Sequence, residues 1–167
     1  MYKNFYLLLF ALICVHVSAQ EYVVIDTANI EVRKAESELF KNRAKIFKKE
    51  LTSKYKGLVG VDIRNSFDEK AKEFEKDILK GQFVFDKRFD DLLKEIVDEL
   101  MAGNEQIPTD MKFYVSRNLD LNAASMGDKN FIVNMGLFYF LQNKGQIAAV
   151  SSHEIAHLML NLSIATI

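Results

Sequence analysis

The chain has 167 residues, of which 49% are hydrophobic and 27% charged, and these proportions are typical of one ordinary globular domain. One Pro and seven Gly exclude a long flexible linker or a low-complexity tract. The formal net charge of −1 gives no indication of a nucleic-acid ligand or of an anionic membrane partner.

Residues 1–19 have the pattern of a secretory signal peptide. Lys3 provides a short positive start, an apolar run follows, and Val17-Ser18-Ala19 places small or modest residues where a signal peptidase needs them. The apolar run is short for a membrane span. We therefore predict an exported protein, periplasmic or secreted, that is cleaved after Ala19. An uncleaved anchor is the alternative.

Cleavage at this position changes the inventory of reactive side chains. Cys14, the only cysteine, is removed, so the mature chain from residue 20 cannot form an internal disulfide. His16 is removed as well, which leaves His153 and His157 as the histidines of the mature protein.

Two helices are predicted before residue 81. Apolar residues among many Lys, Arg and Glu predict a helix from Asp26 to about Tyr55, which Gly57 to Gly60 should end. Ser66 and Glu69 form a capping box that predicts the start of a second helix over 66–80. The basic first helix also leaves open a protein that works at the membrane surface, although a solvated helix face is the commoner explanation.

The remaining elements change in character along the chain. Residues 81–86 should be an extended connector, and residues 87–102 have the apolar side of an amphipathic helix. The sequence then predicts three strands, over 111–116, 122–126 and 130–135, with a turn at 127–129 between the last two. Gly136 opens a short helix over 137–142, and a largely apolar, buried final helix follows over 146–162. The predicted class is α+β, with helices followed by a small antiparallel sheet and two helices.

The final predicted helix contains the sequence HEIAH. Residues four apart lie one above the other on a helix, so His153 and His157 can present both imidazoles to one metal ion. Glu154 lies beside them, where its carboxylate can act as a general base toward water. Two nitrogen ligands, an open coordination position and a base are what a zinc hydrolase requires. The alternative without a metal is that His153 and His157 are two ordinary surface histidines on a helix. The apolar residues on both sides of the motif argue against it.

A third protein ligand for the metal is not evident. The ten residues after His157 contain no Asp, Glu, His or Cys, and Leu160 and Ser163 stand where the metzincin pattern needs Gly and His, which excludes that subclass. An upstream carboxylate, Asp120 or Asp128, could in principle serve, although acids in hairpins usually satisfy turns.

The chain from about residue 81 to residue 160 resembles a family of zinc endopeptidases. The family includes HtpX, the CAAX prenyl endopeptidase and the soluble periplasmic quality-control proteases. The segments that carry the resemblance occur in the family's order: Gly81–Asp86, Asn122-Ala123, Ile132-Val133, Gly136-Leu137, Ile147–Val150 and His153–His157. The resemblance implies a zincin-like fold and a gluzincin-type zinc endopeptidase.

The resemblance also implies roles for individual residues. His153 and His157 would bind one Zn²⁺ per chain, and Glu154 would be the general base. Asn122, Ala123 and Ala124 would form the edge strand that pairs with a substrate backbone, with Asn122 holding the peptide. From the residue alone, without the resemblance, an ordinary turn-exit residue is the favoured interpretation of Asn122.

The chain departs from the family pattern at several points. Gln146 and Ser151 stand where acidic and apolar residues are usual, and the family's downstream Glu ligand and oxyanion-stabilising His or Arg have no counterpart. We therefore expect residues 20–167 to be the N-terminal part of a zinc metallopeptidase domain whose C-terminal part is missing. This polypeptide should then show little or no peptidase activity.

The sequence thus predicts an exported zinc-dependent endopeptidase that acts on polypeptides. Its implied substrates are misfolded or mislocalised envelope proteins, with no nucleic-acid partner and no transmembrane segment after signal removal. A location at the membrane periphery stays open. The alternative is a catalytically inactive, exported helical module that binds partners through residues 26–102.

Overall fold

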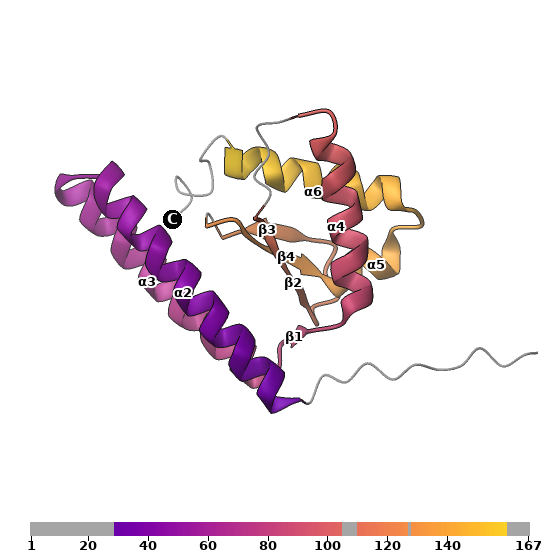
Figure 1. Cartoon of the computed structure of the whole chain (residues 1–167), viewed down its shortest axis with the longest axis horizontal. Coiled ribbons are helices and arrows are strands. Elements are labelled where there is room, and N and C mark those ends of the chain that lie inside the picture. Colours follow the sequence, from indigo (N-terminus) through magenta and orange to yellow (C-terminus); the bar gives the residue numbers. More distant parts are fainter. Residues whose placement is uncertain (1–28, 105–109, 127, 160–167) are drawn as a thin grey trace, which may run out of the picture.

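The computed structural model describes residues 29–104, 110–126 and 128–159, so the predicted signal peptide lies outside the described residues. A long helical hairpin leads into a four-stranded sheet with three further helices (Figure 1), and the predicted α+β class is confirmed. The elements in chain order are α2 Ile30–Lys54, α3 Gly57–Lys80, β1 Phe83–Val84, α4 Lys87–Met101, β2 Lys112–Ser116, β3 Ala123–Ser125, β4 Asn130–Asn134, α5 Met135–Phe140 and α6 Lys144–Met159.

The first helix begins later than the sequence predicted. Asn29 is extended, and its side-chain oxygen accepts hydrogen bonds from the backbone N–H groups of Glu31 and Val32 at 2.9 and 3.2 Å. This is an N-cap, so α2 starts at Ile30 and not at Asp26.

The second helix begins earlier than predicted. Gly57 to Gly60 form its first turn, and Ser66 lies inside α3, so the predicted helix break at these glycines and the predicted cap at Ser66 were wrong. A Cβ on Gly60 would lie 2.3 Å from the carbonyl oxygen of Tyr55. Glycine is needed there because α3 starts directly against the end of α2.

The sheet has the strand order β1-β2-β4-β3. β2 and β4 are parallel, so the sheet is mixed and the predicted wholly antiparallel arrangement was wrong. The predicted hairpin of β3 and β4 is confirmed, with Ala123 opposite Val133, although Gly127 of its turn lies outside the described residues. The expected connector after α3 contains β1, which pairs antiparallel with β2.

The two faces of the sheet are covered by different helices. In β2, Phe113 and Val115 contact the core beneath α4 and α6, whereas Tyr114 between them faces the helical hairpin. This follows from the alternation of side chains along a strand. The molecule therefore has three layers, with the hairpin on one side of the sheet and α4, α5 and α6 on the other.

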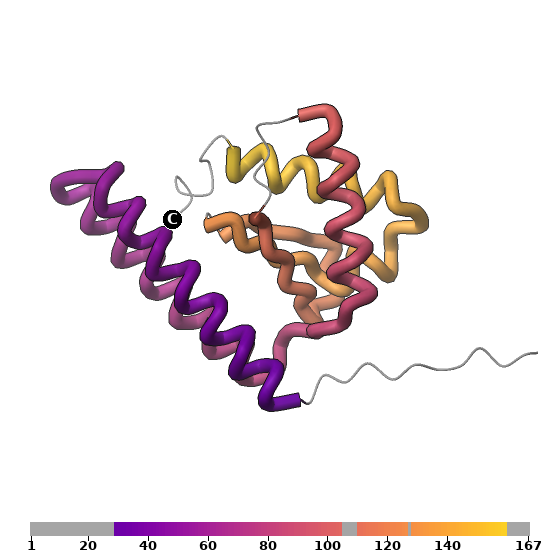
Figure 2. Tube along the Cα trace, in the orientation of Figure 1, coloured from indigo at the N-terminus to yellow at the C-terminus, as the bar shows by residue number. Residues whose placement is uncertain are grey.

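The hairpin contacts the sheet along only part of its length. Its inner half packs through an aromatic cluster in which Phe40 and Phe74 contact Phe83 and Tyr114, with ring centroids 4.6–6.4 Å apart. The outer half has a separate small core around Leu51 and Phe67 that consists of α2 and α3 residues together with Tyr55 between them. Figure 2 shows the two antiparallel helices extending beyond the sheet.

The predicted helix over 87–102 is confirmed as α4, which Asp86 caps by accepting a hydrogen bond from the backbone of Arg88 at 2.9 Å. α5 starts one residue before Gly136, and α6 starts at Lys144 instead of residue 146. Residues 160–162 of the predicted final helix lie outside the described residues. None of the helices described is long and apolar enough to cross a bilayer.

Candidate metal centre

α6 presents the HEIAH motif on the side that does not pack into the core. Ile147, Ser151 and Ile155, spaced four residues apart, are buried against α4 and the sheet. His153 is exposed, and Glu154 and His157 are partly exposed. The sequence predicted a helix buried on most sides, and that was wrong, because small residues such as Ala149 and Ala156 lie on the exposed side and only one apolar stripe faces the core.

The two motif histidines lie close enough to share an ion. Their Nε2 atoms are 2.9 Å apart, and their ring centroids are separated by 4.5 Å. Two zinc–nitrogen bonds of about 2.0–2.1 Å each span more than this separation, so both nitrogens can reach one metal without a change of backbone. The donor pair therefore fits zinc.

Glu154 completes a cluster of three potential ligands. One carboxylate oxygen and the two imidazole nitrogens lie within 4.8 Å of one another. Glu154 follows His153 directly, so its carboxylate leaves the helix beside the imidazole pair. The group is partly open to solvent, which allows a substrate and a water molecule to approach.

Neither upstream carboxylate joins this cluster within the described part of the chain. The carboxylate of Asp128 is buried and accepts a hydrogen bond from the Asn130 side chain at 2.6 Å. Burial raises the pKa of Asp128 to about 6. Asp120 lies in the exposed loop before β3. The structure therefore does not support the idea that Asp120 or Asp128 supplies the third ligand.

The predicted substrate-binding strand lies next to the motif helix. β3 forms one edge of the described sheet and contacts α6. Ala123 and Ala124 belong to β3, and Asn122 precedes it, exposed, with its carbonyl oxygen accepting a hydrogen bond from the backbone of Asn134 at 3.1 Å. The fold thus brings the HEIAH helix and an edge strand together, although thirty residues separate them in sequence.

The hydrogen-bonding direction of β3 differs from residue to residue. The backbone N–H of Asn134 donates to the carbonyl oxygen of Asn122, and the backbone N–H of Met126 donates to the carbonyl oxygen of Asn130. In an antiparallel pair such residues alternate with residues whose N–H and C=O point the other way. The backbone groups of Ala123 and Ser125 therefore point toward the outer edge, and those of Ala124 toward β4. Ser125 was absent from the predicted set, and strand alternation is the signal that identifies it.

Gly136 fixes the loop that leads into β3. A Cβ at this position would lie 2.1 Å from the carbonyl oxygen of Leu119 and 2.6 Å from that of Asp120. The backbone N–H of Gly136 donates to the carbonyl oxygen of Asn118 at 3.1 Å. The first turn of α5 thus lies directly against residues 118–120, and glycine is the residue that permits this approach.

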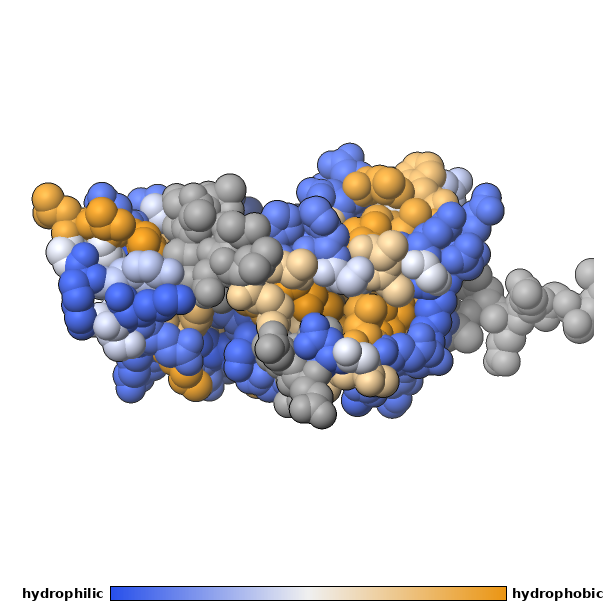
Figure 3. Space-filling model, turned by 90° about the horizontal axis from the view of Figure 1, so that it is seen from above, coloured by the Kyte–Doolittle hydropathy of each residue, from blue (hydrophilic) through white to orange (hydrophobic). Residues whose placement is uncertain are grey.

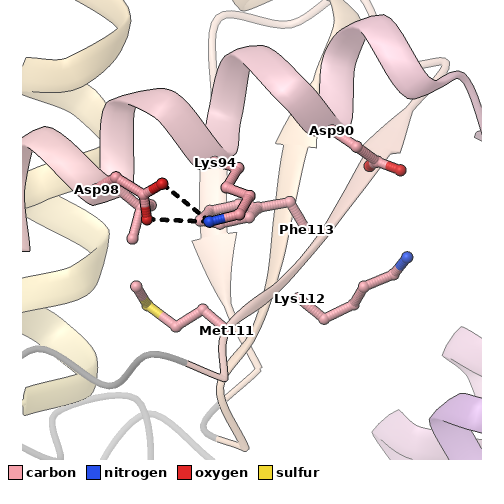
Figure 4. A pocket seen from close by; sticks show the side chains of 7 residues that line it. Asp90, Lys94, Asp98, Met111, Lys112 and Phe113 are labelled. Atoms are coloured by element: carbon pink, nitrogen blue, oxygen red, sulfur yellow. Dashed lines mark hydrogen bonds and ion pairs between the residues drawn. The ribbon is translucent and has the colours of Figure 1, made fainter.

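A separate cavity of about 300 Å³ lies between α4 and β2. Figure 4 shows that Lys94 forms an ion pair with Asp98 across one side, at 2.8 Å, while Asp90 lies at the other end. Burial raises the pKa of Asp90 above its ordinary value. The cavity contains none of the motif residues, so it is distinct from the candidate metal centre.

Part of the chain is similar in sequence to known proteins. Residues 87–167, just under half of the chain, match the model of peptidase family M48. The matched residues include α4, the edge strand β3 and the HEIAH motif of the candidate metal centre.

Two curated relatives match a similar length. The chain is 25% identical over 75 residues, 45% of its length, to the beta-barrel assembly-enhancing protease of Yersinia pestis. It is 30% identical over 73 residues, 41% of its length, to the "Putative beta-barrel assembly-enhancing protease" of Vibrio cholerae. Each match spans 15% of the relative's length. No solved structure matches the chain significantly.

Proposed function

We propose that this chain forms part of an exported zinc-dependent endopeptidase that hydrolyses peptide bonds in unfolded envelope proteins. The observation that carries the proposal is the imidazole pair of His153 and His157, 2.9 Å apart, beside the Glu154 carboxylate and an edge strand. The match of residues 87–167 to peptidase family M48 supports it.

Each motif residue has a distinct role in this proposal. His153 and His157 hold one zinc ion, which when bound supplies a Lewis acid that polarises the scissile carbonyl group. Glu154 takes a proton from the attacking water and delivers it to the leaving amine. Its partly open position lets the carboxylate reach the substrate while α6 stays packed through Ile147 and Ile155.

The substrate is an extended polypeptide that adds a strand to the sheet. The outward-pointing backbone groups of Ala123 supply hydrogen bonds to it, and Asn122 holds the peptide at the start of the strand. Hydrogen bonds between backbones do not depend on the side chains of the substrate, so substrates of many sequences, such as misfolded or mislocalised proteins, can bind. The names of the two relatives, beta-barrel assembly-enhancing proteases, agree with a role in the bacterial envelope. The likeness to HtpX and the CAAX prenyl endopeptidase is part of the same proposal.

We further propose that the metal site of the 167-residue chain is incomplete, since Glu154 acts as the base in this proposal and the cluster contains no other described residue besides the two histidines. Such a site binds and orients zinc poorly. The chain alone should hydrolyse little or no casein, and a longer protein that contains it should be active. Zinc near one per chain, together with casein hydrolysis that Glu154→Gln abolishes, would overturn the incomplete-site proposal.

The endopeptidase proposal is tested in a longer protein that contains the chain, with casein as substrate. Glu154→Gln should abolish hydrolysis while zinc content is kept. Ala123→Pro should lower hydrolysis of casein, because it removes one outward N–H without removing a bond to β4. Ser152→Ala, a neutral change on the same helix, is the control. Unchanged hydrolysis in Glu154→Gln would contradict the role of Glu154 as general base. No hydrolysis by the unmutated longer protein would favour the alternative, an exported interaction module without catalytic activity.

A further inference from the structure

The outer half of the helical hairpin has a core of its own, separate from the core that the inner half shares with the sheet. Its small core consists of Leu51 and Phe67 with their neighbours, all from residues 44–71. The contacts between the hairpin and the sheet come from residues further in, such as Phe40 and Phe74. Phe47 and Phe67 pack with ring centroids 5.1 Å apart, which holds the two helices together beyond the sheet.

The hairpin tip, residues 54–61, carries aliphatic side chains that point to solvent. Leu58, Val59 and Val61 are 84%, 67% and 43% exposed. Single exposed apolar residues are common on protein surfaces, but three within four residues at the end of a projecting hairpin form a patch. Figure 3 shows hydrophobic surface, in orange, at this end of the molecule beside hydrophilic residues in blue.

The outer half of the hairpin, which ends in the apolar tip, carries positive charge. Residues 45–64 contain six basic residues (Lys45, Lys48, Lys49, Lys54, Lys56 and Arg64) against Glu50 and Asp62, a net charge of +4 in a chain of net charge −1. Lys48 forms an ion pair with Asp68, and counting Asp68 still leaves +3. Lys45 and Lys49 form no ion pair with any described residue. The remainder of the chain is therefore acidic, and the basic charge is concentrated around the tip.

We propose that the hairpin tip is a docking site for an anionic lipid surface, with Leu58, Val59 and Val61 entering the headgroup region and Lys45 and Lys49 contacting lipid phosphates. Aliphatic side chains ringed by Lys and Arg are the features by which peripheral proteins bind such surfaces. The site is independent of the metal centre, and the proposal does not rest on peptidase activity.

The geometry favours lipid over a protein occupant. A second copy of the chain, docked tip to tip, would bring a net charge of +4 against another +4. A stable protein interface buries about 800 Å² per partner, and one turn at the end of a convex hairpin offers little area of that kind. A fluid bilayer needs no complementary shape, so three projecting aliphatic side chains can enter it.

A unique fluorophore at the tip reports docking directly. The sequence contains no Trp, so Leu58→Trp places a single indole there, and Tyr139→Trp, on the exposed side of α5, places one at a control site. Each full-length variant is mixed with phosphatidylcholine vesicles, with or without about 30% phosphatidylglycerol, at low salt. The indole at 58 should shift to the blue with anionic vesicles only. The indole at 139 should not shift.

Matched charge variants test the basic ring. With Leu58→Trp as reporter, Lys45→Gln combined with Lys49→Gln should weaken binding to anionic vesicles on the order of thirtyfold, from about 1 kcal/mol for each lysine near the surface. Lys34→Gln combined with Lys72→Gln, on the inner half of the hairpin, makes the same change in charge and should leave binding unchanged. Circular dichroism checks that every variant stays folded.

Three results would overturn the proposal. The first is no shift of the indole at 58 with anionic vesicles, and the second is an equal loss of binding in the two charge variants. The third is a dimer, seen by light scattering without lipid, that Leu58→Ser with Val59→Ser dissolves, because the tip would then bind a second copy.

Discussion

Arg43 of α2 donates a hydrogen bond from Nε to the side-chain oxygen of Asn130 in β4, at 3.0 Å. Its Nη2 also donates to the carbonyl oxygen of Asp110 at 2.8 Å. One guanidinium thus links the hairpin to the first residue of β4 and to the segment before β2. Asn130 is fully buried and orients Asp128, so the link continues into the sheet.

Arg43→Ala should lower the free energy of unfolding by about 2–3 kcal/mol, because it leaves the buried oxygen of Asn130 without its charged donor. Arg43→Lys should cost less, since it keeps the charge but loses the planar donor geometry. Chemical denaturation measures both. Lys34→Ala, exposed on the same helix, should stay within about 0.5 kcal/mol of the wild type. An equal effect of Arg43→Ala and Lys34→Ala would contradict the link.

Asp128 predicts a stability that rises on mild acidification. Burial raises its pKa to about 6 in the folded protein from an ordinary value of 3.8, so the folded state binds the proton more tightly than the unfolded chain. Its contribution is fully present below pH 3.8 and is lost as the pH rises through 6. Asn130 and the cation of Arg43 face this carboxyl group and favour its ionised form, but burial dominates.

The test of Asp128 compares unfolding free energies at two pH values. Between pH 7.5 and 4.5, the wild type should gain about 2 kcal/mol relative to Asp128→Asn, whose side chain does not titrate. The difference between the two proteins removes the contributions of other groups. Parallel pH profiles would contradict the prediction, because they would show that folding does not raise the pKa of Asp128.

Gly136 should be essential for the loop before the edge strand. Gly136→Ala places a Cβ 2.1 Å from the Leu119 carbonyl oxygen, and the backbone on both sides must move. We expect a loss of about 1–3 kcal/mol and faster amide exchange at residues 122–125. Gly103→Ala, whose Cβ meets nothing closer than 3.9 Å, is the matched control. Unchanged amide exchange at β3 in Gly136→Ala would show that the loop before the strand does not stabilise the strand.

Metal binding should depend on the histidine pair and not on Glu154. Zinc should raise the melting temperature, because a ligand that binds the folded state stabilises it. His153→Ala and His157→Ala should each abolish this rise, and Glu154→Gln should retain it. A zinc-dependent rise that survives both histidine variants would place the metal elsewhere.

The sequence alone was sufficient for features that depend on local spacing. The spacing of four between the histidines placed the motif on one side of a helix, and short segments separated by a turn predicted β2, β3 and β4 close to their observed bounds. The apolar side of residues 87–102 likewise predicted α4. These features follow from the repeat of a helix or strand, which needs no knowledge of distant residues.

Only the tertiary structure determined which residues far apart in the sequence contact one another. The parallel pairing of β2 with β4 and the position of β3 at the edge beside α6 depend on contacts across the chain. Gly60 reads locally as a helix breaker, and only its contact with Tyr55 shows that it begins α3. The exposure of HEIAH has the same cause. Local composition made α6 look buried on most sides, but α4 and the sheet cover one stripe and leave the motif beside the edge strand.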